Sequence, residues 1–239
     1  MNAPMHRSFL VVDVENSSEL GNVELAAMRA TLYSVLDDAL TGSVAVVAKE
    51  DRGDGFLLIL EASVLDVLDR LVGQLLEGVH QHNGTVGPLD WLRIRIAAHE
   101  GYVHQGPNGW SSDALTATFR MNNSTLVKET LKGASRAEAV VVVSDAVYQG
   151  IVRHNYRPTV TATGYCSADI PIQGDARVWI RVPGYAEPPV PVRTDAAPPA
   201  EQTGRKSMPG VDGVTANNMF VGDVHAQMII GRDNVSRPA

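Results

Sequence analysis

The chain has 239 residues, 44% of them hydrophobic, and a net charge of −7, which is the composition of an ordinary soluble protein of one or two domains. It contains no block of Lys or Arg, so neither nucleic acid nor an anionic membrane surface is expected as a partner. The single cysteine, Cys166, excludes an intramolecular disulfide, and no apolar stretch approaches the roughly 20 residues that span a bilayer. We therefore expect a cytoplasmic protein that does not enter a membrane.

Apolar runs and helical periodicities alternate along residues 6–184, which predicts one α/β domain. In chain order, the expected elements are a strand at 9–12, a helix over 25–36 with capping residues at 16–19, strands at 43–48 and 56–60, a helix over 64–82, a strand at 91–98, a helix over 113–131, a strand at 139–143, a short helix at 145–152 and a strand at 177–182. The turn at 50–55 joins two of these strands as a hairpin. Residues 153–176 fit either further strands or a loop that wraps around the domain.

Two aspartates follow or join predicted strands. Asp13 ends the first buried strand, and Asp54 lies at the tip of the hairpin. If these strands are neighbours, the two carboxylates project from one edge of the sheet, which suits Mg²⁺ or Mn²⁺. The alternative is purely local: Asp54 belongs only to a turn, and Asp13 caps the helix that follows it.

Four segments resemble the class III adenylyl and guanylyl cyclases in order and spacing. They are VVDVENSS (11–18), EDRGDGFLLIL (50–60), RIAAHEGYVH (95–104) and VVVSDAVYQGIV (141–152). The resemblance is greatest to bacterial cyclase-like modules that carry D-V-E, E-D-R-G-D-G, F-R-M and V-V-S-D. It implies the ferredoxin-like nucleotidyl cyclase fold, a mixed and mainly antiparallel sheet covered by helices.

The resemblance also implies a site. Asp13 and Asp54 would bind two divalent metals, Mg²⁺ or Mn²⁺, together with a nucleoside triphosphate. Backbone amides near Asn16 and Ser17 would bind phosphate, as the N-terminus of a helix can. The protein would be a homodimer in which Arg120 of one chain completes the site of the other.

One helix departs from the family pattern. Active cyclases carry an Asn and, four residues later, an Arg; ALTATFRM (114–121) has Arg120 at the second position but Thr116 at the first. Arg120 would stabilise charge on the transferring phosphoryl group, whereas Thr116 orients the ribose with a hydroxyl alone. Glu50 stands where many guanylyl cyclases have a glutamate that could accept hydrogen bonds from guanine. It could equally be a solvated hairpin charge, so the base stays open.

Residues 185–214 hold clustered prolines and predict a semi-extended linker, which leads to a short tail at 215–239. Within this flexible tail, NNMFVGDVHAQMIIGRDNV (217–235) resembles bacterial amyloid-signalling motifs. It would recruit an effector protein by strand addition or cross-β stacking. The residues expected to carry this interaction are Val224, Gln227, Ile229 and Ile230. The alternative is an ordinary disordered or docked tail.

Two functional hypotheses follow. In the first, a nucleotide-binding signalling protein converts a nucleoside triphosphate to a 3′,5′-cyclic nucleotide and pyrophosphate. In the second, the cyclase fold is catalytically inactive and serves as an interaction module that recruits an effector through its C-terminal motif. Intact Asp13, Asp54 and Arg120 favour the first hypothesis, and Thr116 favours the second.

Overall fold

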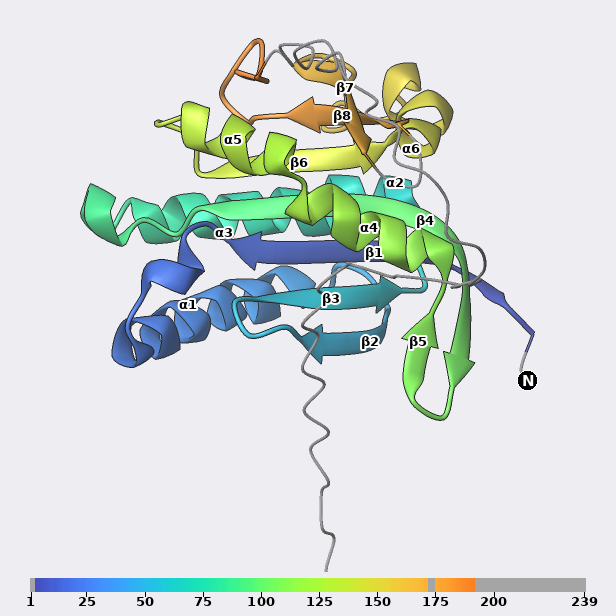
Figure 1. Ribbon diagram of the computed structural model, residues 1–239, viewed down its shortest axis with the longest axis horizontal. Coiled ribbons are helices and arrows are strands. Elements are labelled where there is room, and N and C mark those ends of the chain that lie inside the picture. The colour runs from blue at the N-terminus through green and yellow to red at the C-terminus, as the bar shows by residue number, and fades with distance from the viewer. Residues whose placement is uncertain (1–2, 172–174, 192–239) are drawn as a thin grey trace, which may run out of the picture. The chain divides into compact units, whose positions relative to one another are not determined.

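A computed structural model of the chain describes residues 3–171 and 175–191 (Figure 1). Its centre is an eight-stranded sheet in the order β2-β3-β1-β4-β6-β8-β7, with β5 paired to β4. The strands are β1 (Met5–Val14), β2 (Val46–Asp51), β3 (Gly55–Leu60), β4 (Ile94–Gly106), β5 (Gly109–Ser111), β6 (Ala139–Ser144), β7 (Tyr165–Pro171) and β8 (Asp175–Arg181). Only the β4–β6 pair is parallel among these described strands, so the predicted mixed and mainly antiparallel sheet is confirmed.

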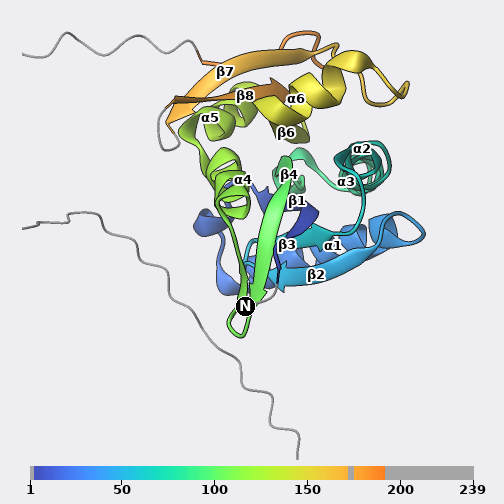
Figure 2. The ribbon, with the colours of Figure 1, turned by 90° about the vertical axis from the view of Figure 1, so that its right-hand side faces the viewer.

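Helices cover both faces of the sheet (Figure 2). They are α1 (Asn22–Leu40), α2 (Val64–Asp66), the π-helical turn η2 (Val67–Val72), α3 (Gly73–Asn83), α4 (Asp113–Asn123), α5 (Thr125–Gly133) and α6 (Asp145–Gly150), with short 3-10 turns η1 (Ser17–Glu19), η3 (Pro88–Asp90) and η4 (Val152–His154). Alternate residues of β1 divide between two cores because successive strand side chains point to opposite faces. Leu10 and Val12 pack with α1, α2 and α3, whereas Phe9 and Val11 pack with α4 and α5.

Several element boundaries differ from the prediction for local reasons. The helix after β1 begins at Asn22 instead of near residues 16–19, which form a 3-10 turn; the backbone N–H of Gly21 is capped by the Glu24 carboxylate at 2.9 Å. The helix predicted over 113–131 is broken at Ser124, whose extended backbone and hydroxyl cap α5 through the Val127 N–H. Strands β5 and β7 were not predicted, and residues 153–176 contain both a loop and a strand.

A buried asparagine ties the end of α3 to the start of β4. Asn83 donates from Nδ2 to the Leu92 carbonyl at 2.9 Å and accepts from the Leu92 N–H at 2.7 Å. Asn83→Leu is expected to lower the free energy of unfolding by about 2 kcal/mol, because both Leu92 groups lose their partner. Asn122→Leu is the matched comparison, since the buried Asn122 amide has no hydrogen-bond partner in the described part of the chain. Urea denaturation should show little change in the free energy of unfolding of Asn122→Leu. Equal decreases in the two variants would contradict a stabilising role for the Asn83–Leu92 hydrogen bonds.

His99 makes the stability of the fold depend on pH. Burial lowers the pKa of His99 to about 4 from the ordinary value of 6.5, and His6 adds a smaller effect. Between these values the unfolded chain binds more protons than the folded one, so stability is complete above pH 6.5 and falls as pH decreases towards 4. The loss attributable to His99 is expected to reach on the order of 3 kcal/mol. Urea denaturation of the wild type and His99→Gln from pH 7 to pH 4.5 should show that the free energy of unfolding falls more steeply with decreasing pH in the wild type. Equal slopes in the two proteins would refute the role of His99.

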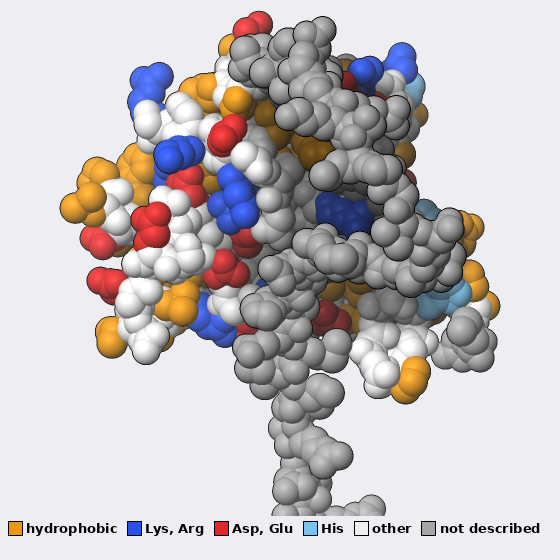
Figure 3. All heavy atoms as spheres, in the orientation of Figure 1, with side chains coloured by type: hydrophobic (Ala, Val, Ile, Leu, Met, Phe, Trp, Pro, Cys, Tyr) orange, Lys and Arg blue, Asp and Glu red, His pale blue; other side chains and the backbone are white. Residues whose placement is uncertain are grey.

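The visible surface mixes charges of both signs. In Figure 3, Lys and Arg side chains alternate with Asp and Glu side chains over the face that the described residues present. No helix within the described residues is long and apolar enough to cross a membrane.

Candidate functional site

The sheet brings the two predicted metal ligands to the same place. Asp13, near the end of β1, lies opposite Gly55 of β3 on one side and opposite Arg95 of β4 on the other. The N–H of Val14 donates to the Asp54 carbonyl at 3.0 Å, so the tip of the β2–β3 hairpin is held against the end of β1. The two aspartates therefore lie together because β1 and β3 are adjacent strands.

Gly55 permits this close approach of the two strands. A Cβ atom at this position would meet the Val12 carbonyl oxygen and would lie 2.8 Å from the Asp13 Cα, closer than real Cβ contacts come. Every side chain larger than hydrogen would therefore push the hairpin away from β1. The glycine of the hairpin therefore lets Asp54 lie close to Asp13.

The turn after β1 contributes a hydroxyl and free amides. Ser17, nearly buried, donates from Oγ to Asp54 Oδ2 at 2.5 Å. Asn16 has a left-handed backbone with φ of 57°, and its carbonyl accepts the Glu19 N–H. Among the described residues, the N–H groups of Asn16, Ser17 and Ser18 donate to no backbone carbonyl. Such unpaired amides in a turn form a concavity suited to an anion.

Burial and nearby charge shape the protonation of Asp13. Desolvation raises the pKa of Asp13, and the negative charge of Asp54 raises it further, against the lowering effect of Arg95. Oδ1 of Asp13 is buried and pairs by charge with Arg95, yet no well-aligned hydrogen bond reaches it from the described residues. Arg95 therefore already compensates part of the Asp13 charge.

Arg95 and Lys128 were not assigned to the site from sequence. Arg95 is 7% exposed and lies on β4 between apolar neighbours. A charged residue within an otherwise apolar strand was the feature of the sequence that could have indicated it, because buried charges are normally paired. Lys128 is an exposed residue of α5, near enough to Asp13 to lower its pKa. No sequence pattern indicated Lys128, because its position depends on how α5 packs against the sheet.

The other predicted site residues are placed around this pair. Glu50 lies on β2 opposite Leu57, which is opposite Val11, so Glu50 shares the sheet face of Asp13. Thr116 and Arg120 are both exposed on α4, one helical turn apart. No hydrogen bond or ion pair within the described part of a single chain joins Arg120 to the aspartates. Val224, Gln227, Ile229 and Ile230 lie outside the described residues.

The donor set fits a hard divalent cation in part. Asp13 and Asp54 supply carboxylate oxygens, the ligand type that Mg²⁺ and Mn²⁺ prefer, and Arg95 contacts Oδ1 of Asp13. Residues 3–171 and 175–191 contain no cluster of three or more His, Cys, Asp or Glu side chains able to hold a metal. Two carboxylates leave coordination positions for other oxygens, as in sites where Mg²⁺ is shared with substrate phosphates.

Solved structures of adenylate and guanylate cyclases have a fold similar to that of this chain. The sequence matches no known family model and no curated protein. The structure is similar to an adenylate/guanylate cyclase/hydrolase from Silicibacter pomeroyi, with a TM-score of 0.54 and 19% identity over 76% of this chain and 98% of that one. It is also similar to a bacterial light-regulated adenylyl cyclase, with a TM-score of 0.52 and 12% identity over 74% of this chain and 90% of that one. At such identities the similarity establishes the fold.

Proposed function

We propose that this protein is a nucleotide-binding signalling domain that converts a nucleoside triphosphate to a 3′,5′-cyclic nucleotide and pyrophosphate. The observation that carries the proposal is that Asp13 and Asp54 lie close together at the end of β1. Ser17 donates a hydrogen bond to Asp54, and Arg95 forms an ion pair with Asp13. The cyclase-type fold supports it independently.

Each residue has a proposed part in the reaction. Asp13 and Asp54 would hold two Mg²⁺ or Mn²⁺ ions, which would acidify the ribose 3′-hydroxyl and neutralise charge on the triphosphate. The 3′-oxygen bonds to the α-phosphorus, the bond from that phosphorus to the bridging oxygen breaks, and the hydroxyl proton leaves to solvent. The amides near Asn16 and Ser17, together with Arg95, would bind the phosphates.

The exposed α4 residues suggest a site shared between two chains. Arg120 and Thr116 face solvent on α4 and make no bond to Asp13 or Asp54 of their own chain in the described residues. In a homodimer, Arg120 of the partner would stabilise the transition state and Thr116 would orient the ribose. Glu50, on the same face as Asp13, would contact the base.

The proposal is tested by incubating the purified protein with each ribonucleoside triphosphate and Mn²⁺ and identifying cyclic products by mass spectrometry. A cyclic nucleotide is the expected product, and its base would show what Glu50 accepts. Mixing inactive Asp54→Ala and Arg120→Ala proteins should then restore roughly a quarter of wild-type activity, since half of the dimers carry one intact site of two. A folded dimer that forms no cyclic product from any triphosphate would overturn the catalytic proposal.

A second candidate function is a catalytically inactive module that recruits an effector through residues 217–235. The observation in its favour is Thr116, whose hydroxyl donates to the Ser112 carbonyl at 3.0 Å and so has its proton engaged within α4. Its test is deletion of residues 217–235 in cells. Loss of signalling in the deletion, with normal signalling in Asp54→Ala, would support recruitment, and a signalling defect in Asp54→Ala alone would support catalysis.

A further inference from the structure

The segment between η4 and β7 is a compact loop, residues 155–164. Oδ1 of Asn155 accepts the N–H of Ala162 at 2.8 Å, which brings the two ends of the loop together. The N–H of Val160 donates to the Arg157 carbonyl at 3.1 Å and makes a tight turn at the tip. The Val160 side chain is buried in the core on the α1–α3 face of the sheet. The loop is therefore an ordered unit with its own internal bonds, typical of functional surface loops.

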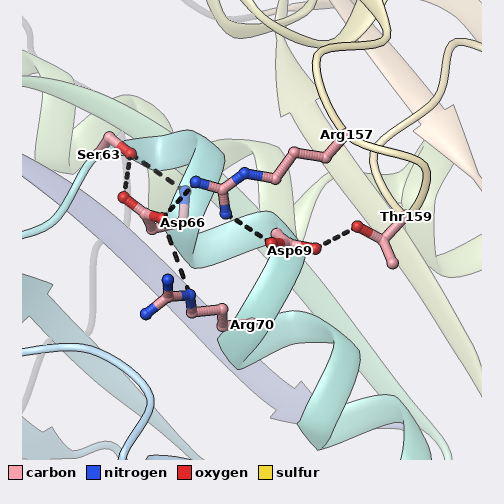
Figure 4. A network of polar contacts seen from close by, with 6 residues as sticks. All are labelled: Ser63, Asp66, Asp69, Arg70, Arg157 and Thr159. Carbon is pink, nitrogen blue, oxygen red and sulfur yellow. Dashed lines mark hydrogen bonds and ion pairs between the residues drawn. The ribbon is translucent and has the colours of Figure 1, made fainter.

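Ion pairs hold the tip of this loop on the helix beneath it (Figure 4). Arg157 contacts Asp66 at 2.7 Å with one nitrogen and Asp69 at 2.5 Å with another, and the Thr159 hydroxyl also donates to Asp69. The two aspartates lie on α2 and on the π-helical turn η2. π-Helical turns are rare and frequently occur at functional sites. Polar contacts at Arg157 and Thr159, together with the buried Val160 side chain, thus hold the loop on the helix.

Beneath the loop is a cavity of about 330 Å³. Its apolar wall includes Leu68, Val72, Val141 and Val160, and its polar wall includes Asp69, Tyr165 and Arg181. The volume is at the small end of the range for ligand sites, roughly 300–1,000 Å³. An apolar wall with a few polar groups is the usual composition of a site for a small organic molecule.

Arg181 makes the cavity suitable for an anion. Arg157 pairs with both Asp66 and Asp69, whereas no carboxylate in the described part of the chain forms an ion pair with Arg181. Among the residues that line the cavity, Arg181 is the one cation and Asp69 is the one carboxylate, and Asp69 is already bound by Arg157 and Thr159. Burial raises the pKa of Tyr165 to about 12, so its hydroxyl stays protonated as a donor.

We propose that the cavity under loop 155–164 binds a small organic carboxylate. Its carboxylate would pair with the Arg181 guanidinium and accept from the Tyr165 hydroxyl, and its hydrocarbon part would lie against Leu68, Val72 and Val141. The site is separate from the aspartate pair: Arg181, Val141, Ile96 and Val12 lie in one cross-strand row on the α1–α3 face, whereas Asp13 is on the other face. The proposal is thus independent of catalysis.

Isothermal titration calorimetry of the full chain with acetate, butyrate, isovalerate and benzoate tests the proposal. At least one of the larger acids should bind saturably at one site, and its neutral amide should bind at least ten-fold more weakly. Arg181→Gln should weaken binding at least ten-fold, which is about 1.4 kcal/mol. Arg177→Gln removes the same charge from the same strand, beside Asp169 and outside the cavity lining, and should bind as the wild type does.

A second variant keeps the test independent of any folding defect in Arg181→Gln. Gly73 lines the cavity at the start of α3, and a Cβ added there meets no atom within 4 Å. Gly73→Leu should therefore keep or raise the melting temperature, since Gly is costly in a helix, while the new side chain narrows the cavity and weakens binding at least ten-fold. Binding of wild-type affinity in folded Gly73→Leu, equal binding of acid and amide, or no saturable binding of any of the four acids to the wild type would each overturn the proposal.

Discussion

Asp54→Ala is expected to lower cyclic nucleotide formation by at least about a thousand-fold, a loss of about 4 kcal/mol of transition-state stabilisation. The reason is that Asp54 supplies one of two carboxylates for the metals and is the acceptor of the Ser17 hydroxyl. The remaining Asp13 is partly neutralised by Arg95 and cannot bind two divalent ions alone. The measurement is the initial rate of product formation with Mn²⁺, read by mass spectrometry.

The control for this prediction is Asp37→Ala, which removes an exposed carboxylate whose partner is Lys49 at 2.9 Å. A surface pair of this kind contributes little to stability, so activity should be unchanged. Binding of Mn²⁺ with a non-hydrolysable triphosphate, measured by calorimetry, gives a second readout and should be at least ten-fold weaker in Asp54→Ala alone. If Asp54→Ala retained a tenth of wild-type activity, Asp54 would not be a metal ligand.

Gly55→Val is expected to damage both the fold and the site. The new side chain would collide with the Val12 carbonyl oxygen and with the Cα and Cβ atoms of Asp13. These atoms belong to the backbone or lie next to it, so they cannot rotate away. Separation of β3 from β1 should lower the free energy of unfolding by about 3 kcal/mol, at the upper end for overpacking. The displaced hairpin would also move Asp54 from Asp13, so binding of Mn²⁺ with triphosphate should weaken about a hundred-fold, comparable to the loss of a supporting residue around a metal.

Gly87→Ala provides the comparison, because Gly87 has an ordinary φ of −74° and a Cβ there meets nothing within 4 Å. Its unfolding curve and Mn²⁺ binding should match those of the wild type. Urea denaturation measures the first effect and calorimetry the second. A Gly55→Val protein with wild-type stability and metal binding would show that the close contact of β1 with β3 does not position the aspartates.

The local sequence was informative where one short segment decides its own structure. The apolar run before Asp13 indicated a buried strand, and the turn at 50–55 indicated a hairpin; both are present as β1 and β2–β3. Periodicity was less informative at helix ends. Residues 16–19 contain good capping side chains, but α1 begins at Asn22, because the chain first makes a 3-10 turn that places Ser17 against Asp54. A tertiary contact decided that boundary.

The same distinction applies to the candidate site. The sequence predicted that Asp13 and Asp54 lie together only if their strands are neighbours. The pairing of β1 with β3 meets that condition. Arg95 and Lys128 came near Asp13 only through the pairing of β4 with β1 and the packing of α5. Nothing local indicated that loop 155–164 would close over a cavity, since its anchors, Asp66 and Asp69, lie about ninety residues earlier.

The sequence by itself determined most of the segments that become strands and helices, though not β5, β7 or the exact helix ends, because strand and helix periodicity, turn residues and caps act over a few neighbouring positions. It also determined which side chains carry charge suited to metal and phosphate. Only the tertiary structure decided which of those charges meet, how deeply Asp13 is buried, and where a cavity remains. The physical reason is that pairing order, register and burial arise from contacts between residues distant in the chain, and desolvation and charge act through space.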